Sequence, residues 1–229
     1  MRKSREFHSC EMPACAEASA GKPDYKILKV LVLNASLKHA PDISNTEELV
    51  QEVLDAMKEF GAIESEIVRL ADKNIPVGLG FKESDDDEWP QIVEKIKAAD
   101  VIIFAMLIWW GNRSSLMQRI LERFDALDEE YSVSGRSVIY NKVAGVVITG
   151  SEDGAQNALG SLMNVLTWFG FTFPPEAAAY WVGEVGMDPK TDRERRLANK
   201  SAHYMAKTLA RNLSYFAKLL KQHPLEPKK

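Results

Sequence analysis

The chain has 229 residues, 45% of them hydrophobic, with a formal net charge of −4 and a sequence pI near 5.7. This length and apolar content suit one α/β domain with extensions, so no second domain is required. The acidic balance argues against nucleic acid as the main partner, because neutralising phosphates takes a basic face. No stretch has the length of a membrane span or the apolar core of a signal peptide, so we expect no membrane partner and a soluble, cytoplasmic protein.

Residues 1–24 are typical of an extension rather than of a folded segment. They show no apolar periodicity, so we expect a flexible extension, then one domain over 25–222 and a basic tail over 223–229. The only cysteines of the chain, Cys10 and Cys15, lie in this extension. A disulfide or a share in a metal site is open to them. Two cysteines without a matching histidine pattern cannot complete a four-ligand site, however, so we predict no bound metal.

A predicted strand, a polar loop and a helix start come first in the predicted domain. Residues 30–36 form an apolar run that ends in a small hydroxyl residue, and Ser44, Asn45 and Thr46 open a helix. The free N–H groups and positive dipole end of such a helix bind anions without a basic side chain. The chain lacks GxxxxGK[ST], and no GxGxxG follows the first strand, which favours a monophosphate over a triphosphate or dinucleotide. Alternatively, the three polar residues serve only as helix caps.

Strands and helices alternate through the rest of the domain. Apolar runs predict four further strands, over 63–70, 101–108, 143–149 and 171–182, with Pro174 and Pro175 inside the last. Helical periodicity predicts four further helices, over 89–98, 116–124, 155–169 and 193–221. Such alternation implies a five-stranded parallel sheet with helices on both faces, in the order 2-1-3-4-5. The loops after strands one, three and four should then line one site, where the strand order reverses.

Two adjacent tryptophans, Trp109 and Trp110, end the third predicted strand. Neighbouring residues of an extended chain point to opposite sides, so both rings cannot face the core, and one should be exposed or bound. With Gly111 beside them, which lets backbone approach a ligand, they suit a flat ring system. The alternative is a ring that packs on the next helix or at a subunit contact.

The loop after the fourth strand, residues 149–154, combines two glycines with small polar side chains. It can form a tight turn with exposed N–H groups, which suits carbonyl oxygens or ring nitrogens of a ligand. Ser151 or Asp153 can cap the following helix at the same time.

Together these segments resemble the NAD(P)H-dependent FMN reductases and the related flavodoxin-fold quinone reductases. The resemblance covers about residues 27–186, and it rests on the phosphate loop, on 109–115 as the aromatic-Trp-Gly flavin loop, and on 149–154 with 170–175 and 180–184. It implies a flavodoxin-like three-layer sandwich that binds FMN. The positions that it implies for FMN are Ser36, Lys38, Ser44, Asn45, Thr46, Ile108, Trp109, Trp110, Gly111, Asn112, Thr149, Gly150, Ser151, Glu152, Asp153 and Gly154.

Two departures from this family are visible. Leu107 stands where the family often has proline, and an insertion over 39–42 lengthens the phosphate loop. The first could shift the flavin ring and the second could change how the phosphate is wrapped. The cysteine clusters of iron–sulfur flavoproteins are missing from this sequence, so we predict no iron–sulfur centre.

The resemblance implies an FMN-dependent oxidoreductase that passes a hydride from NAD(P)H to a quinone or another flat acceptor by a ping-pong cycle, with no obligatory catalytic side chain. It also implies a homodimer or homotetramer with the site near a subunit contact. One rival is an electron-transfer flavoprotein that does not use NAD(P)H. Another is a scaffold that has lost its cofactor.

Other polar features indicate structure rather than chemistry. The run Asp85, Asp86 and Asp87 could bind a divalent cation, but we expect an exposed, solvated loop. His203 has no matching ligand one helical turn away, so we expect a surface or packing histidine. No G-x-S-x-G elbow is present, and we predict no covalent nucleophile.

Overall fold

The computed structural model describes residues 27–127, 137–151 and 153–226. The expectations for the N-terminal extension with its two cysteines and for Glu152 lie outside these residues. The strands are β1 (Leu28–Ala35), β2 (Ile63–Arg69), β3 (Val101–Trp109), β4 (Asn112–Arg113), β5 (Val143–Gly150) and β6 (Ala178–Val182). The α-helices are α1 (Asn45–Glu59), α2 (Trp89–Ala98), α3 (Ser115–Arg123), α5 (Ala155–Phe169), α6 (Pro189–Leu197) and α7 (Lys200–Gln222), with short 3₁₀ helices η1 (Leu70–Asp72) and η2 (Phe124–Ala126).

The sheet confirms the predicted parallel topology. Its order is β2-β1-β3-β5-β6 with all these neighbours parallel, which is the predicted 2-1-3-4-5 once the extra strand β4 is set aside. β4 is a two-residue strand that pairs antiparallel with the end of β3. The order reverses between β1 and β3, so a ligand crevice is expected outside the carboxyl ends of these strands.

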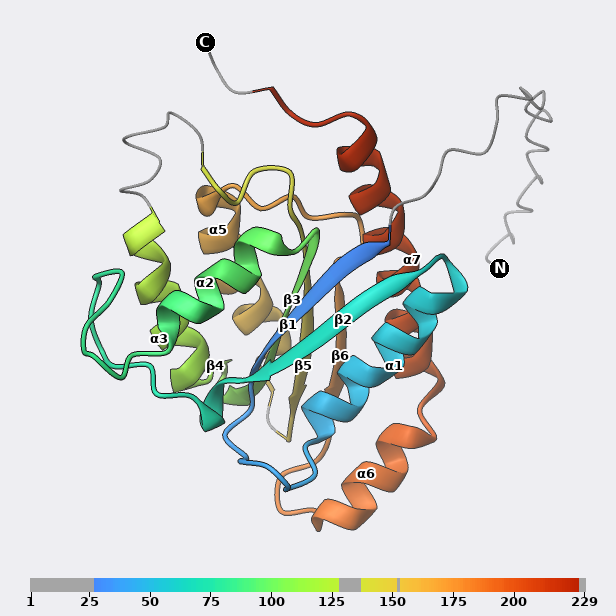
Figure 1. Ribbon diagram of the computed structural model, residues 1–229. Helices are drawn as coiled ribbons and strands as arrows, with labels where there is room; N and C mark the ends of the chain where they lie inside the picture. The colour runs from blue at the N-terminus through green and yellow to red at the C-terminus, as the bar shows by residue number, and fades with distance from the viewer. Residues whose placement is uncertain (1–26, 128–136, 152, 227–229) are drawn as a thin grey trace, which may run out of the picture.

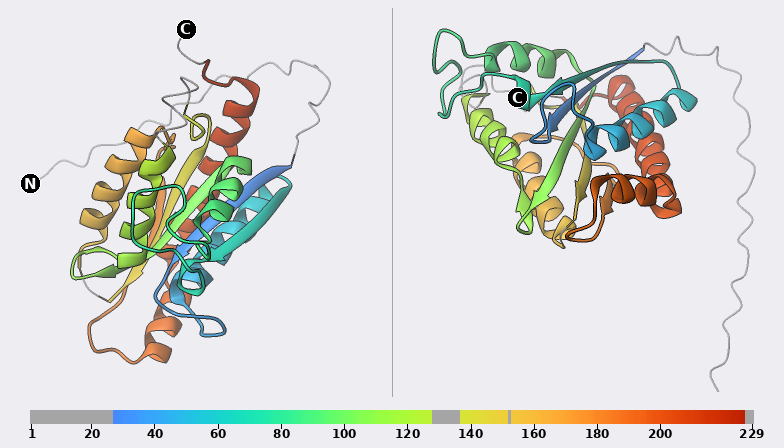
Figure 2. Two further views of the ribbon diagram at one scale, coloured as in Figure 1. Left: turned by 60° about the vertical axis from the view of Figure 1, so that its left-hand side comes forward. Right: turned by 90° about the horizontal axis from the view of Figure 1, so that it is seen from below.

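Helices cover both faces of the sheet, as Figure 1 and the view from below in Figure 2 show. Along β1, Val30 and Val32 pack in a buried cluster with α1 and α7, whereas Leu31 and Leu33 join the cluster under α2, α3 and α5. This alternation follows from the two-residue period of a strand. Each fully buried aliphatic side chain stabilises the fold by about 1.5–3 kcal/mol, so β1 is held rigidly from both sides.

Two predicted elements are wrong in their extent. The last strand does not run from residue 171, because Thr172 makes only an isolated bridge to Val143 and β6 begins at Ala178. The proline pair explains the gap, since proline has no N–H for a ladder. The predicted last helix is two helices: α6 ends at Leu197, and Asn199 caps α7 by accepting from the N–H of Ala202 at 2.8 Å.

The acidic run is also not uniformly solvated. Asp87 and Arg123 are both fully buried and form an ion pair at 2.7 Å. Arg123 also donates to the backbone carbonyls of Pro76, Gly80 and Phe81. Burial alone would raise the pKa of the Asp87 carboxyl, but the Arg123 guanidinium and two backbone N–H groups hold that pKa below its ordinary value. The carboxylate therefore ties this loop to α3 and is no free cation ligand.

Candidate functional site

Three loops meet at the carboxyl edge of the sheet, at the lower end of the view in Figure 1. They follow β1, β3 and β5, which are neighbours in the sheet and end at Ala35, Trp109 and Gly150. Ser114 joins two of them, because its hydroxyl donates to the carbonyl of Ala35 at 2.8 Å while it caps α3. Sequence reasoning missed this residue, since a helix cap in isolation does not show which strand it touches.

The loop after β1 presents hydroxyl groups at the start of α1. Ser44 caps this helix by accepting from the N–H of Glu47, as the capping alternative requires. The buried hydroxyls of Thr46 and Thr149 lie 2.6 Å apart, which joins α1 to the end of β5. The hydroxyl of Ser36 is buried and has no hydrogen-bond partner among the described residues. A buried polar atom without a partner is rare and costly, so this hydroxyl is the clearest mark of a missing ligand.

The inserted residues of this loop fold outward. His39 bonds Asp72 of η1 at 2.9 Å, and Arg69 donates to the carbonyl of Asp42 at 3.2 Å. The ammonium of Lys38 donates to the carbonyl of Ile43 at 2.8 Å, within the loop itself. The contact that Lys38 makes here is therefore with the backbone of its own loop and not with the hydroxyl groups at the start of α1.

Two carboxylates in the first turn of α1 are neutralised. Glu47 receives hydrogen bonds from Asn34 at 2.8 Å and from Arg69 at 3.0 Å. Glu48 binds Arg193 in a bidentate pair, and this guanidinium holds the pKa of the Glu48 carboxyl below its ordinary value. Since both negative charges are paired, the positive end of the α1 dipole remains available to an anion.

The loop after β3 is a tight hairpin. Trp110 and Gly111 have φ of +46° and +72°, and they join Trp109 to its partner Asn112. Two successive positive φ angles are typical of a two-residue turn between antiparallel strands. Trp109 is 58% exposed and Trp110 77% exposed, so neither ring packs in the core of this chain.

A close backbone approach joins the hairpin to the loop after β5. A Cβ at Gly154 would lie 2.5 Å from the Cα of Gly111. Asn157 of α5, which sequence reasoning missed, adds a hydrogen bond from its amide to the carbonyl of Gly111 at 3.0 Å. Ile108 is buried under Gly150, with which its side chain is in close contact, so it supports the loop instead of lining it.

Three further predicted residues lie in different parts of the site. Ser151 and Asp153 are exposed at the tip of the loop after β5, and Asp153 accepts from the N–H of Gly154 at 2.7 Å. The side-chain amide of Asn45 donates to Asp192 of α6 at 2.7 Å. Asp192 is a third residue that sequence reasoning missed, because it lies far along the chain.

These groups fit a flavin monophosphate. The unpartnered Ser36 hydroxyl and the first N–H groups of α1 suit a phosphate, because they are donors at a positive helix end. The close approach of Gly154 and Gly111 brings backbone from two loops together, where an extended planar ring can lie against it. No cationic side chain is needed in this scheme.

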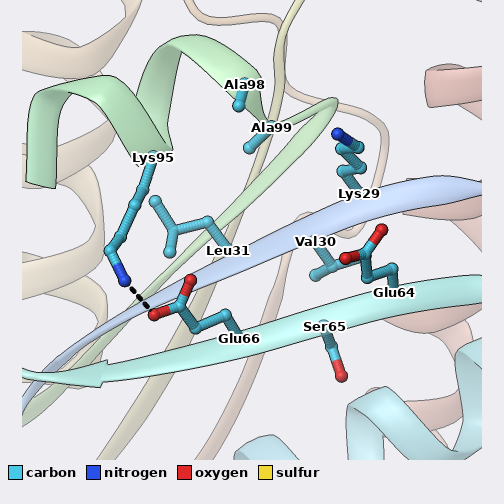
Figure 3. A pocket seen from close by; sticks show the side chains of 9 residues that line it. All are labelled: Lys29, Val30, Leu31, Glu64, Ser65, Glu66, Lys95, Ala98 and Ala99. Carbon is cyan, nitrogen blue, oxygen red and sulfur yellow. Dashed lines mark hydrogen bonds and ion pairs between the residues drawn. The ribbon is translucent and has the colours of Figure 1, made fainter.

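A pocket elsewhere shows different chemistry. It has a volume of about 190 Å³ and lies along β1, β2 and α2 (Figure 3). Lys95 and Glu66 form an ion pair across it. Its lining residues come from the first halves of β1 and β2, away from the carboxyl ends of these strands. This pocket therefore does not belong to the site.

In the part of the chain that the structure describes, every helix is too short or too polar to cross a membrane.

Comparisons with known proteins identify the family. Residues 28–184 match the family of NADPH-dependent FMN reductases. The 8-demethyl-8-aminoriboflavin-5'-phosphate synthase of Streptomyces davaonensis is 35% identical over 211 residues, which are 86% of this chain and 80% of that protein.

Two solved structures are similar to this chain. RosB, with a bound 8-demethyl-8-formylriboflavin-5'-phosphate intermediate, has a TM-score of 0.75 at 32% identity, over 86% of this chain and 82% of its own. An apo NADH:FMN oxidoreductase, EMOB, has a TM-score of 0.62 at 17% identity, over 86% and 92%, and shows the fold alone. The flavodoxin-like fold expected from the sequence is thus confirmed. The chain belongs to the NADPH-dependent FMN reductase family and is an enzyme that uses FMN with NAD(P)H as the electron donor.

Proposed function

We propose that the protein passes electrons from NAD(P)H to a quinone or another flat small molecule, with FMN held by the three loops. The observation that carries this proposal is the buried Ser36 hydroxyl without a partner among the described residues. Its backbone N–H is bonded to Asn34, which in turn donates to Glu47 of α1. These contacts tie the backbone of Ser36 to the first turn of α1, whose first N–H groups suit a phosphate.

Each loop then has its own role. Ser36, Ser44, Asn45 and Thr46 bind the phosphate through hydroxyl, amide and helix N–H groups. The hairpin over 109–112 and the loop over 149–154 hold the isoalloxazine ring through backbone groups. FMN supplies the redox chemistry when bound, and the protein supplies orientation and electrostatics.

The exposed hairpin favours a flat acceptor. Trp109 and Trp110 present large aromatic surface at the mouth of the site, where a planar ring can stack. Donor and acceptor would use the same face in turn, which gives a ping-pong cycle. We further propose a homodimer or homotetramer that covers these tryptophans, in the cytoplasm.

Steady-state kinetics test this function. NADPH or NADH oxidation by a quinone should give parallel double-reciprocal lines as the quinone concentration is varied. Trp110→Ala should raise KM for the quinone, whereas the control Tyr204→Ala should not, because Tyr204 is also a largely exposed aromatic residue but lies on α7. A flavoprotein that binds FMN yet oxidises neither nucleotide would be the electron-transfer rival.

A second candidate is that the flavin phosphate is a substrate. The observation that favours it is the 35% identity to a synthase whose product is an 8-aminoriboflavin phosphate, over most of both chains. Mass spectrometry of the flavin after incubation separates the two functions. An FMN of unchanged mass after many turnovers supports the oxidoreductase, and a flavin altered on its ring supports the second candidate.

A further inference from the structure

Helix α6 stands at the carboxyl edge of the sheet, next to the start of α1 (Figures 1 and 2). Its Asp192 receives two hydrogen bonds from neutral donors. Oδ2 accepts from the side-chain amide of Asn45 at 2.7 Å, and Oδ1 accepts from the indole N–H of Trp181 in β6 at 3.0 Å. One carboxylate therefore joins α6, α1 and β6 beside the phosphate loop.

The chain makes room for this carboxylate. A Cβ at Gly183, just after β6, would lie 2.0 Å from Oδ1 of Asp192. Any side chain at this position must displace the carboxylate, because real contacts of this kind do not come so close. Glycine here is thus explained by the close approach of Asp192.

Two arginines hold α6 in this position. The buried Arg196 donates to Glu52 and to Glu48 of α1, each at 2.7 Å. Arg193 adds its bidentate pair with Glu48. Charge-assisted hydrogen bonds of this kind are stronger than neutral ones and fix direction. Asp192 is therefore held against the amide of Asn45 by its own helix.

We propose that Asp192 is a positioning residue that orients the Asn45 amide toward the phosphate of the flavin. A carboxylate only accepts hydrogen bonds, so it selects the Nδ2 side of the amide and excludes Oδ1. One N–H of Nδ2 is bound to Asp192, and the second is left for a phosphate oxygen. This inference rests on the proposed phosphate site at the start of α1.

Asp192→Asn tests the inference with little change of shape. The indole of Trp181 can only donate, so the new amide must turn its oxygen to Trp181 and its NH₂ to Asn45. The Asn45 amide then has to flip and present its oxygen there, which removes the N–H offered to the phosphate. FMN affinity should fall about tenfold, as expected for one lost hydrogen bond, and riboflavin affinity should change less than about twofold.

Trp181→Phe provides the rescue. In the double variant with Asp192→Asn and Trp181→Phe, the amide at position 192 no longer has to accept from an indole and can turn its oxygen to Asn45. The double variant should therefore regain most of the FMN affinity that Asp192→Asn alone loses. A role of Asp192 in packing alone would make the double variant as weak as the single one, or weaker. Arg195 lies on the same helix as Asp192, and Arg195→Gln, which breaks its exposed ion pair with Glu184, should leave both affinities unchanged.

Two further variants decide the case if Asp192→Asn does not fold. Asn45→Ala removes the amide directly, and Gly183→Ala displaces the carboxylate. Each should reduce the preference for FMN over riboflavin, measured by flavin fluorescence quenching. An unchanged preference in these variants would overturn the role of Asp192. A wild-type protein that binds FMN and riboflavin equally would instead contradict the phosphate site itself.

Discussion

Ser36 illustrates how a ligand site shows itself in a single residue. The side chain is buried and its hydroxyl has no partner among the described residues, although its backbone N–H is bonded to Asn34 at 3.0 Å. Such an arrangement costs folding free energy in the absence of ligand, and binding removes the cost. We therefore expect the Ser36 hydroxyl to lower the stability of the ligand-free protein and to increase its affinity for FMN.

Ser36→Ala should therefore act in opposite directions on stability and binding. Without FMN, the variant should be as stable as the wild type or more stable, because no buried hydroxyl is left unsatisfied. Its FMN affinity should fall by about 1.5–3 kcal/mol, the range for a hydrogen bond to a charged group. Thermal unfolding without ligand and FMN titration measure the two effects. A destabilised variant with unchanged affinity would assign Ser36 to the core instead.

Gly154 is the second residue with a sharp expectation. Its φ is +123°, and an added Cβ would lie 2.5 Å from the Cα of Gly111. Gly154→Ala should force the hairpin away from the loop after β5, at a strain of about 1–3 kcal/mol, and weaken FMN and riboflavin alike. Gly160→Ala in α5 is the matched control, because a Cβ there meets open space and alanine favours the helix. If Gly154→Ala keeps full flavin affinity with an unchanged circular dichroism spectrum, the two loops do not hold the ring.

The sequence predicted that glycines matter at these loops but not which contacts they make. The proposal that Gly111 lets backbone approach a ligand stays a prediction; an added Cβ there would meet open space. Its positive φ follows from the two-residue turn with Trp110. The contact between Gly111 and Gly154 links residues far apart in the chain, so no local pattern reveals it.

At the scale of elements, α6, α7 and α1 are joined by charged groups at one end of the sheet. Both ring nitrogens of His203 face acceptors, with the Leu197 carbonyl at 2.8 Å and a Glu52 carboxylate oxygen at 2.9 Å. Only the doubly protonated ring donates from both nitrogens. These hydrogen bonds raise the pKa of His203 above its ordinary value, although the nearby Arg196 opposes the shift. The surface histidine expected from the sequence thus ties α7 to α6 and α1.

A pH-dependent stability follows from this histidine. Since the folded-state pKa is raised, its contribution is fully present below the ordinary histidine pKa of about 6.5 and is lost as the pH rises through the folded value. His203→Gln should therefore destabilise the protein more at about pH 5.5 than at about pH 9. Urea unfolding of both proteins at the two pH values measures this difference. An equal loss at both would show that the ring is not charged in the folded state.

Element boundaries were the least predictable part of the fold. No proline or glycine stands between Arg193 and the apolar pattern of α7, so the sequence alone indicates one helix; the break occurs where Asn199 caps α7. The strand over 171–182 looked continuous in hydrophobicity, but Pro174 and Pro175 cannot join a ladder. The sequence indicates that Asp87 is one more acidic surface residue, because its buried partner Arg123 lies far along the chain, at the end of α3.

For the whole molecule, strict alternation of apolar strands and amphipathic helices was enough to predict the sheet order. A parallel order then places the loops after β1, β3 and β5 at one edge without further information. The contacts that hold these loops were not predictable, since Ser114, Asn157 and Asp192 act through tertiary hydrogen bonds. The strand order thus determines where the candidate site lies, and tertiary hydrogen bonds hold its loops in place.

The carboxyl edge of the sheet is proposed to bind FMN for reduction by NAD(P)H. Anaerobic titration of the purified, FMN-loaded protein with NADPH or NADH tests it most directly, with Ser36→Ala as the variant of weakened binding. The visible flavin band should bleach with one equivalent of nucleotide per bound flavin and return when a quinone is added. A protein that takes up no FMN, or whose bound flavin stays oxidised with excess NADPH and NADH, would not be an FMN-dependent oxidoreductase of this kind.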